Sequence, residues 1–130
     1  MKKIRIVHIE DNPDDAALIH RSLRKYGFDV EATLLDTSDA LSEALSTQSW
    51  DIVLSDYSMP NFDGLSALKQ IIQFDSDLPF ILVSGAVGEE IAVQLMRAGS
   101  KDYIMKDTLS RLGPAVEREL VDAEVRREKN

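Results

Sequence analysis

The chain of 130 residues contains no cysteine and no long apolar run. Without cysteine it can form neither disulfides nor thiolate metal sites. No stretch is apolar and long enough to span a bilayer, and the first five residues lack the apolar segment of a signal peptide. We therefore expect a cytoplasmic protein with no membrane partner.

Basic and aromatic residues are also scarce. The chain has 15 Lys and Arg against 23 Asp and Glu, a net charge of −8, and only 6% aromatic residues. Recognition of nucleic acid needs clustered basic side chains or aromatic stacking platforms, so we expect no nucleic-acid partner. The acidic balance instead favours cations and basic protein surfaces.

Five short runs of β-branched and aliphatic residues alternate with segments of helical spacing. The runs occupy residues 4–9, 28–34, 52–54, 80–83 and 103–105. The helices are expected between residue 13 and Gly27, over 38–47, from Gly64, over 89–98, and after Pro114. Runs this short are typical of buried parallel strands, so the pattern predicts an α/β fold with one doubly wound sheet of five strands and five helices.

The last stretch is the most highly charged. Nine of the fourteen residues from 117 to 130 are charged, while Val116, Leu120 and Ala123 form a narrow apolar stripe. We interpret it as an amphipathic terminal helix, with the start of a coiled-coil linker as the alternative. The expected organisation is one domain over residues 1–123, followed by a charged helix end over 124–130 that begins a linker to further domains.

Polar side chains follow four of the five predicted strands. Glu10 and Asp11 follow the first, Asp56 the third, Ser84 ends the fourth, and Lys106 follows the fifth. Each alone is explained by a helix cap, a turn or a solvated surface. Together they converge, because ligands in such folds bind at the carboxyl ends of the strands.

Three carboxylates at one edge require a cation. Two unit charges about 4 Å apart repel by roughly 4 kcal/mol at an effective dielectric constant near 20. Mg²⁺ binds oxygen ligands and commonly pairs one or two carboxylates with a phosphate, and a lysine is suited to a phosphoryl oxygen. An aspartate beside such an ion can act as a nucleophile towards phosphorus.

Four segments resemble the receiver (response-regulator, CheY-like) domain of two-component signalling, over about residues 3–123. They are IVHIEDNPDD at 6–15, DIVLSDYSMPNFDG at 51–64, ILVSGAVGEE at 81–90 and AGSKDYIMKD at 98–107. The resemblance implies a flavodoxin-like strand order of 2-1-3-4-5. It also implies a signalling switch in a phosphorelay that accepts a phosphoryl group from a sensor histidine kinase or a histidine phosphotransfer protein. Such a switch is not an enzyme beyond its own phosphorylation and slow dephosphorylation.

The resemblance also implies a role for particular residues at the phosphoryl group. Asp56 matches the phosphoacceptor, Lys106 and Ser84 match the side chains that contact the phosphoryl group, and the Gly85 N–H is a further donor. Ser84 and Tyr103 match the switch pair. The surface of the fourth helix, fifth strand and fifth helix is the expected output face, through which the domain could form a homodimer.

The resemblance further implies a Mg²⁺ site. Asp11 matches the direct ligand, Glu10 an acidic residue that acts through water, and Asp56 and the backbone carbonyl of Ser58 complete the set. Glu10 stands where the family more often has aspartate, and Asp107 where it often has proline. Because a cis bond before a residue other than proline costs roughly 2.5–4 kcal/mol, we expect a trans Lys106–Asp107 bond with Lys106 still pointing inward.

Other functions fit the sequence less well. Aspartate-nucleophile phosphatases place D-x-D after the first strand, where residues 10–12 here read Glu-Asp-Asn. A flavin carrier would need a phosphate loop in place of the acidic residues 11–15. A receiver-like module that binds partners without phosphorylation remains the alternative, although Asp56 and Lys106 are both present. We interpret His8 and His20 as structural or solvated, with no second ligand nearby, and Trp50 as a packing residue.

Overall fold

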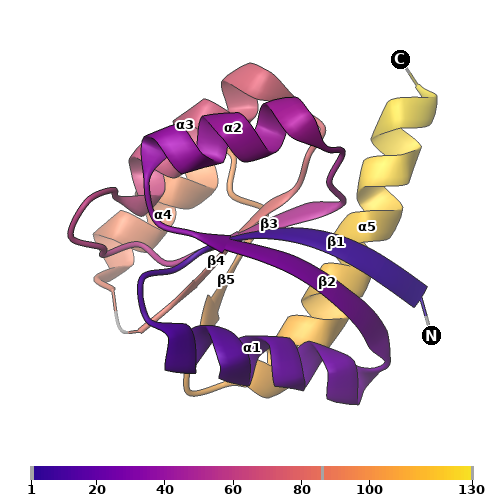
Figure 1. Ribbon diagram of the computed structural model, residues 1–130, viewed down its shortest axis with the longest axis horizontal. Coiled ribbons are helices and arrows are strands. Elements are labelled where there is room, and N and C mark those ends of the chain that lie inside the picture. Colours follow the sequence, from indigo (N-terminus) through magenta and orange to yellow (C-terminus); the bar gives the residue numbers. More distant parts are fainter. Residues whose placement is uncertain (1, 86, 130) are drawn as a thin grey trace.

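The computed structural model describes residues 2–85 and 87–129, in which strands and helices alternate along the chain (Figure 1). The strands are β1 (Lys2–Ile9), β2 (Phe28–Leu35), β3 (Ile52–Ser55), β4 (Phe80–Ser84) and β5 (Asp102–Met105). The helices are α1 (Pro13–Tyr26), α2 (Ser38–Thr47), α3 (Gly64–Phe74), α4 (Glu89–Ala98) and α5 (Leu112–Glu128), with a 3₁₀ turn, η1 (Leu109–Arg111), before α5.

The five strands form one parallel sheet in the order β2-β1-β3-β4-β5. This confirms the predicted fold class and strand order. Every residue of β3 and β4 is buried. These strands are continuous apolar runs because both of their faces are covered by helices.

Helices cover the two faces of the sheet unequally. In Figure 1, α1 and α5 lie on one face and α2, α3 and α4 on the other. Alternate residues of β1 supply the two cores: Ile6 packs with Leu23 and Val116 on the first face, and Val7 with Leu68 on the second. This is the alternation that a strand with two buried faces requires.

The ends of α1 are those that the sequence predicts. Asn12 is the N-cap, and its side chain accepts hydrogen bonds from the backbone N–H groups of Asp14 and Asp15. Pro13 occupies the first helical position, where its missing N–H would have no partner in any case. Gly27 ends the helix at a φ of 125°, a backbone conformation that favours glycine.

The predicted strands agree with the observed ones to within two residues at each end, but one predicted helix start is wrong. We expected the fifth helix to follow Pro114, but α5 begins at Leu112 and contains Pro114 in its first turn. The first turn of a helix has no internal acceptor for its N–H groups, so proline is tolerated there. The stripe of Val116, Leu120 and Ala123 is buried in the packed domain, as the amphipathic-helix interpretation requires.

The described part of the chain has no cis peptide bond, so the Lys106–Asp107 bond is trans as expected. Its helices include none long and apolar enough to cross a membrane.

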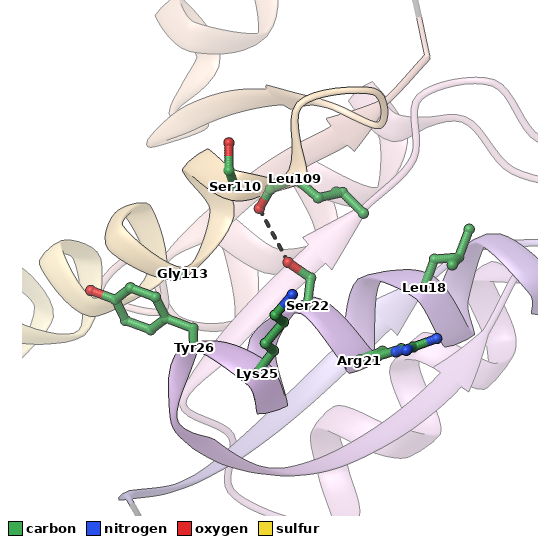
Figure 2. Close-up of a pocket in the computed structure, with 8 residues that line it drawn as sticks. All are labelled: Leu18, Arg21, Ser22, Lys25, Tyr26, Leu109, Ser110 and Gly113. Atoms are coloured by element: carbon green, nitrogen blue, oxygen red, sulfur yellow. Dashed lines mark hydrogen bonds between the residues drawn. The ribbon is translucent and has the colours of Figure 1, made fainter.

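A shallow groove between α1 and the start of α5 is lined by Leu18, Tyr26 and Leu109 (Figure 2). Beside it, Ser22 Oγ donates a hydrogen bond to the Leu109 carbonyl at 3.2 Å. No carboxylate lines this groove.

Candidate functional site

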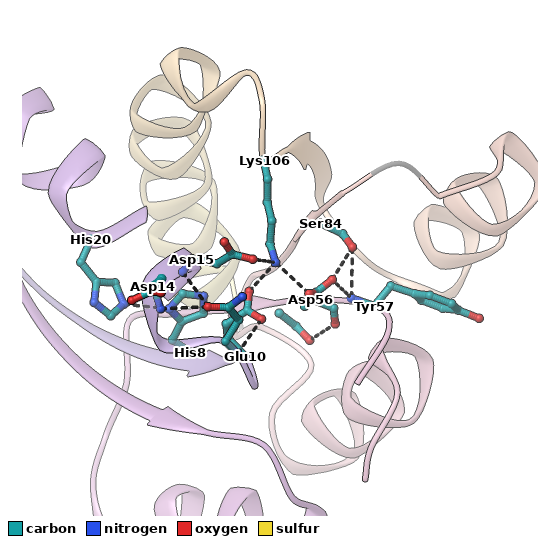
Figure 3. A network of polar contacts seen from close by, with 11 residues as sticks. His8, Glu10, Asp14, Asp15, His20, Asp56, Tyr57, Ser84 and Lys106 are labelled. Carbon is teal, nitrogen blue, oxygen red and sulfur yellow. Dashed lines mark hydrogen bonds and ion pairs between the residues drawn. The ribbon is translucent and has the colours of Figure 1, made fainter. Parts of the chain in front are cut away.

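The side chains that follow the strands meet at the carboxyl edge of the sheet (Figure 3). Glu10 comes directly after β1, Asp56 directly after β3, Ser84 is the last residue of β4, and Lys106 directly follows β5. Glu10, Asp56 and Ser84 are buried. The parallel strand order therefore brings together four side chains that lie between residues 10 and 106 of the sequence.

Lys106 lies at the centre of this cluster and points inward, as expected. Its Nζ atom is 2.8 Å from Glu10 Oε1, 2.9 Å from Asp56 Oδ2 and 2.7 Å from Asp15 Oδ2. Asp15, on the first turn of α1, was not among the predicted site residues. One ammonium group thus neutralises part of the charge of three carboxylates.

The other oxygen of Asp56 is held by two donors. Asp56 Oδ1 accepts hydrogen bonds from the hydroxyl of Ser84 and from the backbone N–H of Tyr57, the latter at 2.7 Å. The carbonyl of Ser84 accepts from the backbone N–H of Lys106 at 2.8 Å, which ties the loops after β4 and β5 together. Both carboxylate oxygens of Asp56 therefore have fixed partners.

These contacts separate the protonation states of the two buried acids. Burial opposes ionisation of Asp56, but the hydrogen bonds from Ser84 and Lys106 outweigh it and lower the Asp56 pKa below its ordinary value. Burial, together with repulsion from Asp56, raises the pKa of Glu10 to about 7 despite the Lys106 contact. Asp56 is consequently ionised at neutral pH, whereas Glu10 titrates near neutral pH.

The pKa of Lys106 shifts upward. Burial alone would lower it, but the hydrogen bonds to Asp15, Glu10 and Asp56 raise the Lys106 pKa above its ordinary value. The side chain therefore remains an ammonium group across the physiological pH range and keeps its three N–H donors.

The predicted metal ligands include three carboxylates that gather at one point. Glu10, Asp11 and Asp56 each offer an oxygen within 4.8 Å of the others, with Asp11 exposed at the rim. Oxygen-only ligands with an open, solvent-facing side suit Mg²⁺, which retains several waters when bound to proteins. Ser58 lies exposed in the loop after β3. The donor set thus fits the hard cation that the sequence predicts.

Tyr103 and Gly85 are connected beside the cluster. The Tyr103 hydroxyl donates to the Gly85 carbonyl at 2.9 Å and accepts from the Val87 N–H at 3.4 Å. Gly85 directly follows Ser84, so the ring of Tyr103 is linked through one loop to the hydroxyl that contacts Asp56.

The interpretation of the two histidines needs correction. His8 and His20 were expected to have no second ligand nearby, yet His8 Nδ1 and His20 Nε2 are 2.7 Å apart. His8 is fully buried two residues before Glu10, and its Nε2 atom has no hydrogen-bond partner in the described part of the chain. Burial, with repulsion from His20 and Lys106, lowers the His8 pKa to about 3. The contact links β1 to α1.

Gly64 is a second position that sequence reasoning missed. A Cβ atom there would lie 2.9 Å from the Asp56 carbonyl oxygen and 2.9 Å from Tyr57 Cα, closer than real contacts allow. The Gly64 N–H donates to the Tyr57 carbonyl at 2.8 Å. Glycine is required because the start of α3 packs directly on the backbone that carries Asp56.

Comparison with known proteins identifies the family. Residues 6–117 match the family described as response regulator receiver domain, and the chain belongs to this family. Receiver domains are signalling switches rather than classical enzymes. They are phosphorylated by histidine kinases or phosphotransfer proteins, and they bind Mg²⁺ at an acidic pocket.

Individual relatives agree with this assignment. Chemotaxis protein CheY of Bacillus subtilis is 33% identical over 102 residues, which cover 78% of this chain and 84% of CheY. Transcriptional regulatory protein PrrA of Mycobacterium leprae is 32% identical over 102 residues, which cover 78% of this chain and 43% of PrrA. The matched residues thus cover less than half the length of PrrA.

Solved structures show the same fold. Full-length FixJ from B. japonicum superposes with a TM-score of 0.83 at 29% identity, covering 98% of this chain and 63% of the FixJ chain. A CheY-like receiver domain protein from Methanospirillum hungatei has a TM-score of 0.80 at 22% identity, covering 97% of this chain and 99% of the other.

Proposed function

We propose that this chain is a phosphorylation-dependent switch in which Asp56 accepts a phosphoryl group from a phosphohistidine, in a Mg²⁺-dependent reaction. The observation that carries the proposal is the environment of Asp56. It is a buried aspartate kept ionised, with Lys106 at one oxygen and the Ser84 hydroxyl at the other. The partner is a sensor histidine kinase or a histidine phosphotransfer protein, met in the cytoplasm.

The transfer needs few groups besides these. A carboxylate oxygen of Asp56 forms a bond to phosphorus while the bond from phosphorus to the histidine nitrogen breaks, and the electron pair of that bond stays on the nitrogen. Asp56 needs no base because it is already ionised. The Lys106 ammonium stabilises the charge on the phosphoryl oxygens, and the Gly85 N–H is a further donor.

Glu10, Asp11, Asp56 and the Ser58 carbonyl are the proposed metal-holding groups. A bound Mg²⁺ supplies positive charge that offsets the repulsion between the carboxylates and the incoming phosphoryl group. Glu10 would act on the ion through water and in its ionised form, which its raised pKa disfavours.

The loop after β4 connects the phosphoryl site to the output face. In the unphosphorylated form the Ser84 hydroxyl donates to Asp56, and this contact is lost if the hydroxyl turns to the phosphoryl group. Tyr103 is bonded to the neighbouring Gly85 carbonyl, so movement of this loop changes the position of its ring. The proposed readout is the surface of α4, β5 and α5, which also serves a homodimer.

Two measurements test this function. Incubation with acetyl phosphate should label the protein in the presence of Mg²⁺ but not with a chelator. Asp56→Asn should abolish labelling, while Asp51→Asn, a matched charge change before β3, should leave it intact. Binding of beryllofluoride should change the rate of amide hydrogen exchange between residues 84 and 116. The absence of labelling would overturn the proposed chemistry, and unchanged exchange would overturn the proposed output face.

A further inference from the structure

We propose that Asp15 is a positioning residue for Lys106, which keeps the lysine ammonium at the phosphoryl pocket when a metal ion takes the other carboxylates. The inference rests on the proposed function of the site. It concerns the one carboxylate partner of Lys106 that lies on a helix instead of after a strand (Figure 3).

The contact is as short as any other that Lys106 makes. Asp15 Oδ2 lies 2.7 Å from Lys106 Nζ, compared with 2.8 Å for Glu10 and 2.9 Å for Asp56. The Asp15 side chain is 34% exposed and that of Lys106 is 20% exposed, so water screens this ion pair only in part. Lys106 Nζ donates hydrogen bonds to Asp15 and Asp56 and forms an ion pair with Glu10.

Local backbone structure directs Asp15 towards the lysine. Asn12 caps α1 and accepts from the Asp15 N–H at 3.2 Å, which makes Asp15 the third helical residue. An acidic side chain at that position commonly turns back to the N–H of the cap residue. Here Glu10 Oε2 accepts from the Asn12 N–H at 3.2 Å, and the Asp15 carboxylate binds Lys106 instead.

The two other partners of Lys106 belong to the metal-holding group. Glu10 and Asp56 converge with Asp11, whereas Asp15 is not a member of that group. A cation bound there competes with Lys106 for Glu10 and Asp56 and repels the ammonium. The Asp15 contact is not contested, so it holds Lys106 at the rim of the pocket, within reach of a phosphoryl group on Asp56.

Binding of beryllofluoride at saturating Mg²⁺ tests this role. Asp15→Asn should weaken beryllofluoride binding about fivefold, the size expected for loss of one partly exposed ion pair. Asp15→Glu should recover most of the affinity. Asp14→Asn is the matched control, because it removes the same charge from the same turn at an exposed position, and it should leave the affinity within about twofold. Equal effects of Asp14→Asn and Asp15→Asn would overturn the proposal.

A second measurement follows the lysine itself. In the presence of Mg²⁺, Lys106 should be acylated several-fold faster by an amine-reactive reagent in Asp15→Asn than in the parent or in Asp14→Asn, as mapped by peptide mass spectrometry. Unchanged acylation would contradict the positioning role even if the protein bound no beryllofluoride. Failure of the parent to bind beryllofluoride would count against the proposed function. If the parent binds beryllofluoride and Asp15→Asn binds it with the same affinity, only the role of Asp15 is overturned.

Discussion

The two edges of the sheet carry similar charged residues in different arrangements. Near the amino ends of the strands, Lys3 pairs with Glu31 at 3.1 Å, with side chains 63% and 46% exposed, and Arg127 pairs with Asp75 at 2.8 Å. At the carboxyl edge, one lysine contacts three carboxylates, and the Glu10 side chain is fully buried.

Burial and convergence, rather than composition, distinguish the two edges. An exposed pair is screened by water and contributes little to stability, and either partner can be solvated alone. At the cluster, Glu10 and Asp56 are buried and cannot turn to bulk water, so the charge of each depends on Lys106 or on a cation that replaces it. In the proposed function, this dependence couples the carboxyl edge to metal ions and phosphoryl groups.

Removal of the central lysine should show the largest difference between the edges. Lys106→Met should lower the free energy of unfolding of the metal-free protein by about 2 kcal/mol, because it leaves buried carboxylates without their cation. The expected loss is smaller than that for a fully buried ion pair because Lys106 is partly exposed. Lys3→Met should change stability little. Urea unfolding in a chelator measures the free energy of unfolding of both variants. Added Mg²⁺ should raise this free energy more for Lys106→Met than for the parent. Equal losses in the two variants would refute the comparison.

The histidine pair should give stability a pH dependence that the exposed edge lacks. The His8 pKa falls from 6.5 to about 3 on folding, so its contribution is complete above pH 6.5 and is lost as the pH falls towards 3. In that window the stability of the parent relative to His8→Gln should rise with pH by up to about 1.4 kcal/mol per unit.

The parent must be compared with the His8→Gln variant because Glu10 changes the stability of the protein with pH in the opposite direction. Its raised pKa favours the folded state at low pH, and this contribution is lost as the pH rises through about 7. Glu10 is present in both proteins, so its effect is largely shared. Parallel stability profiles between pH 4 and 6.5 would show that His8 does not titrate as its burial predicts.

Tyr103→Phe should have the smallest effect. It removes the hydroxyl that donates to Gly85 and accepts from the Val87 N–H, both at the surface end of the cluster. Amide exchange at Val87 should accelerate by about threefold, with global stability nearly unchanged. Slower exchange at Val87, or a large loss of global stability, would be inconsistent with a local hydrogen bond.

Most of the fold could be predicted because local signals agree with the tertiary structure. The run from Phe80 to Ser84 is apolar enough to require cover on both faces, and Asn12 and Gly27 mark the ends of α1 as their chemistry predicts. The start of α5 was misplaced because Pro114 is equally compatible with a boundary and with a first turn. Only the packing of Leu112 distinguishes the two.

The site residues that follow strands could be predicted. Those on α1 were harder to predict, because their positions depend on which side of the helix faces the site. Glu10, Asp56 and Lys106 meet because strand ends in a parallel sheet share an edge. Asp15 was missed because an acid in the first turn of a helix is already explained by the helix dipole. The His8–His20 contact had a signal, since His20 follows the buried Ala16 by four residues and so lies on the inward face of α1.

The most direct test of the account is the position of the phosphoryl group. After reaction with phosphoramidate and Mg²⁺, peptide mass mapping should find the modification on Asp56 and on no other carboxylate of the cluster, because Asp56 alone combines burial, a lowered pKa and contacts to both Lys106 and Ser84. Modification of Asp11, Asp15 or a histidine with Asp56 unmodified would contradict the account.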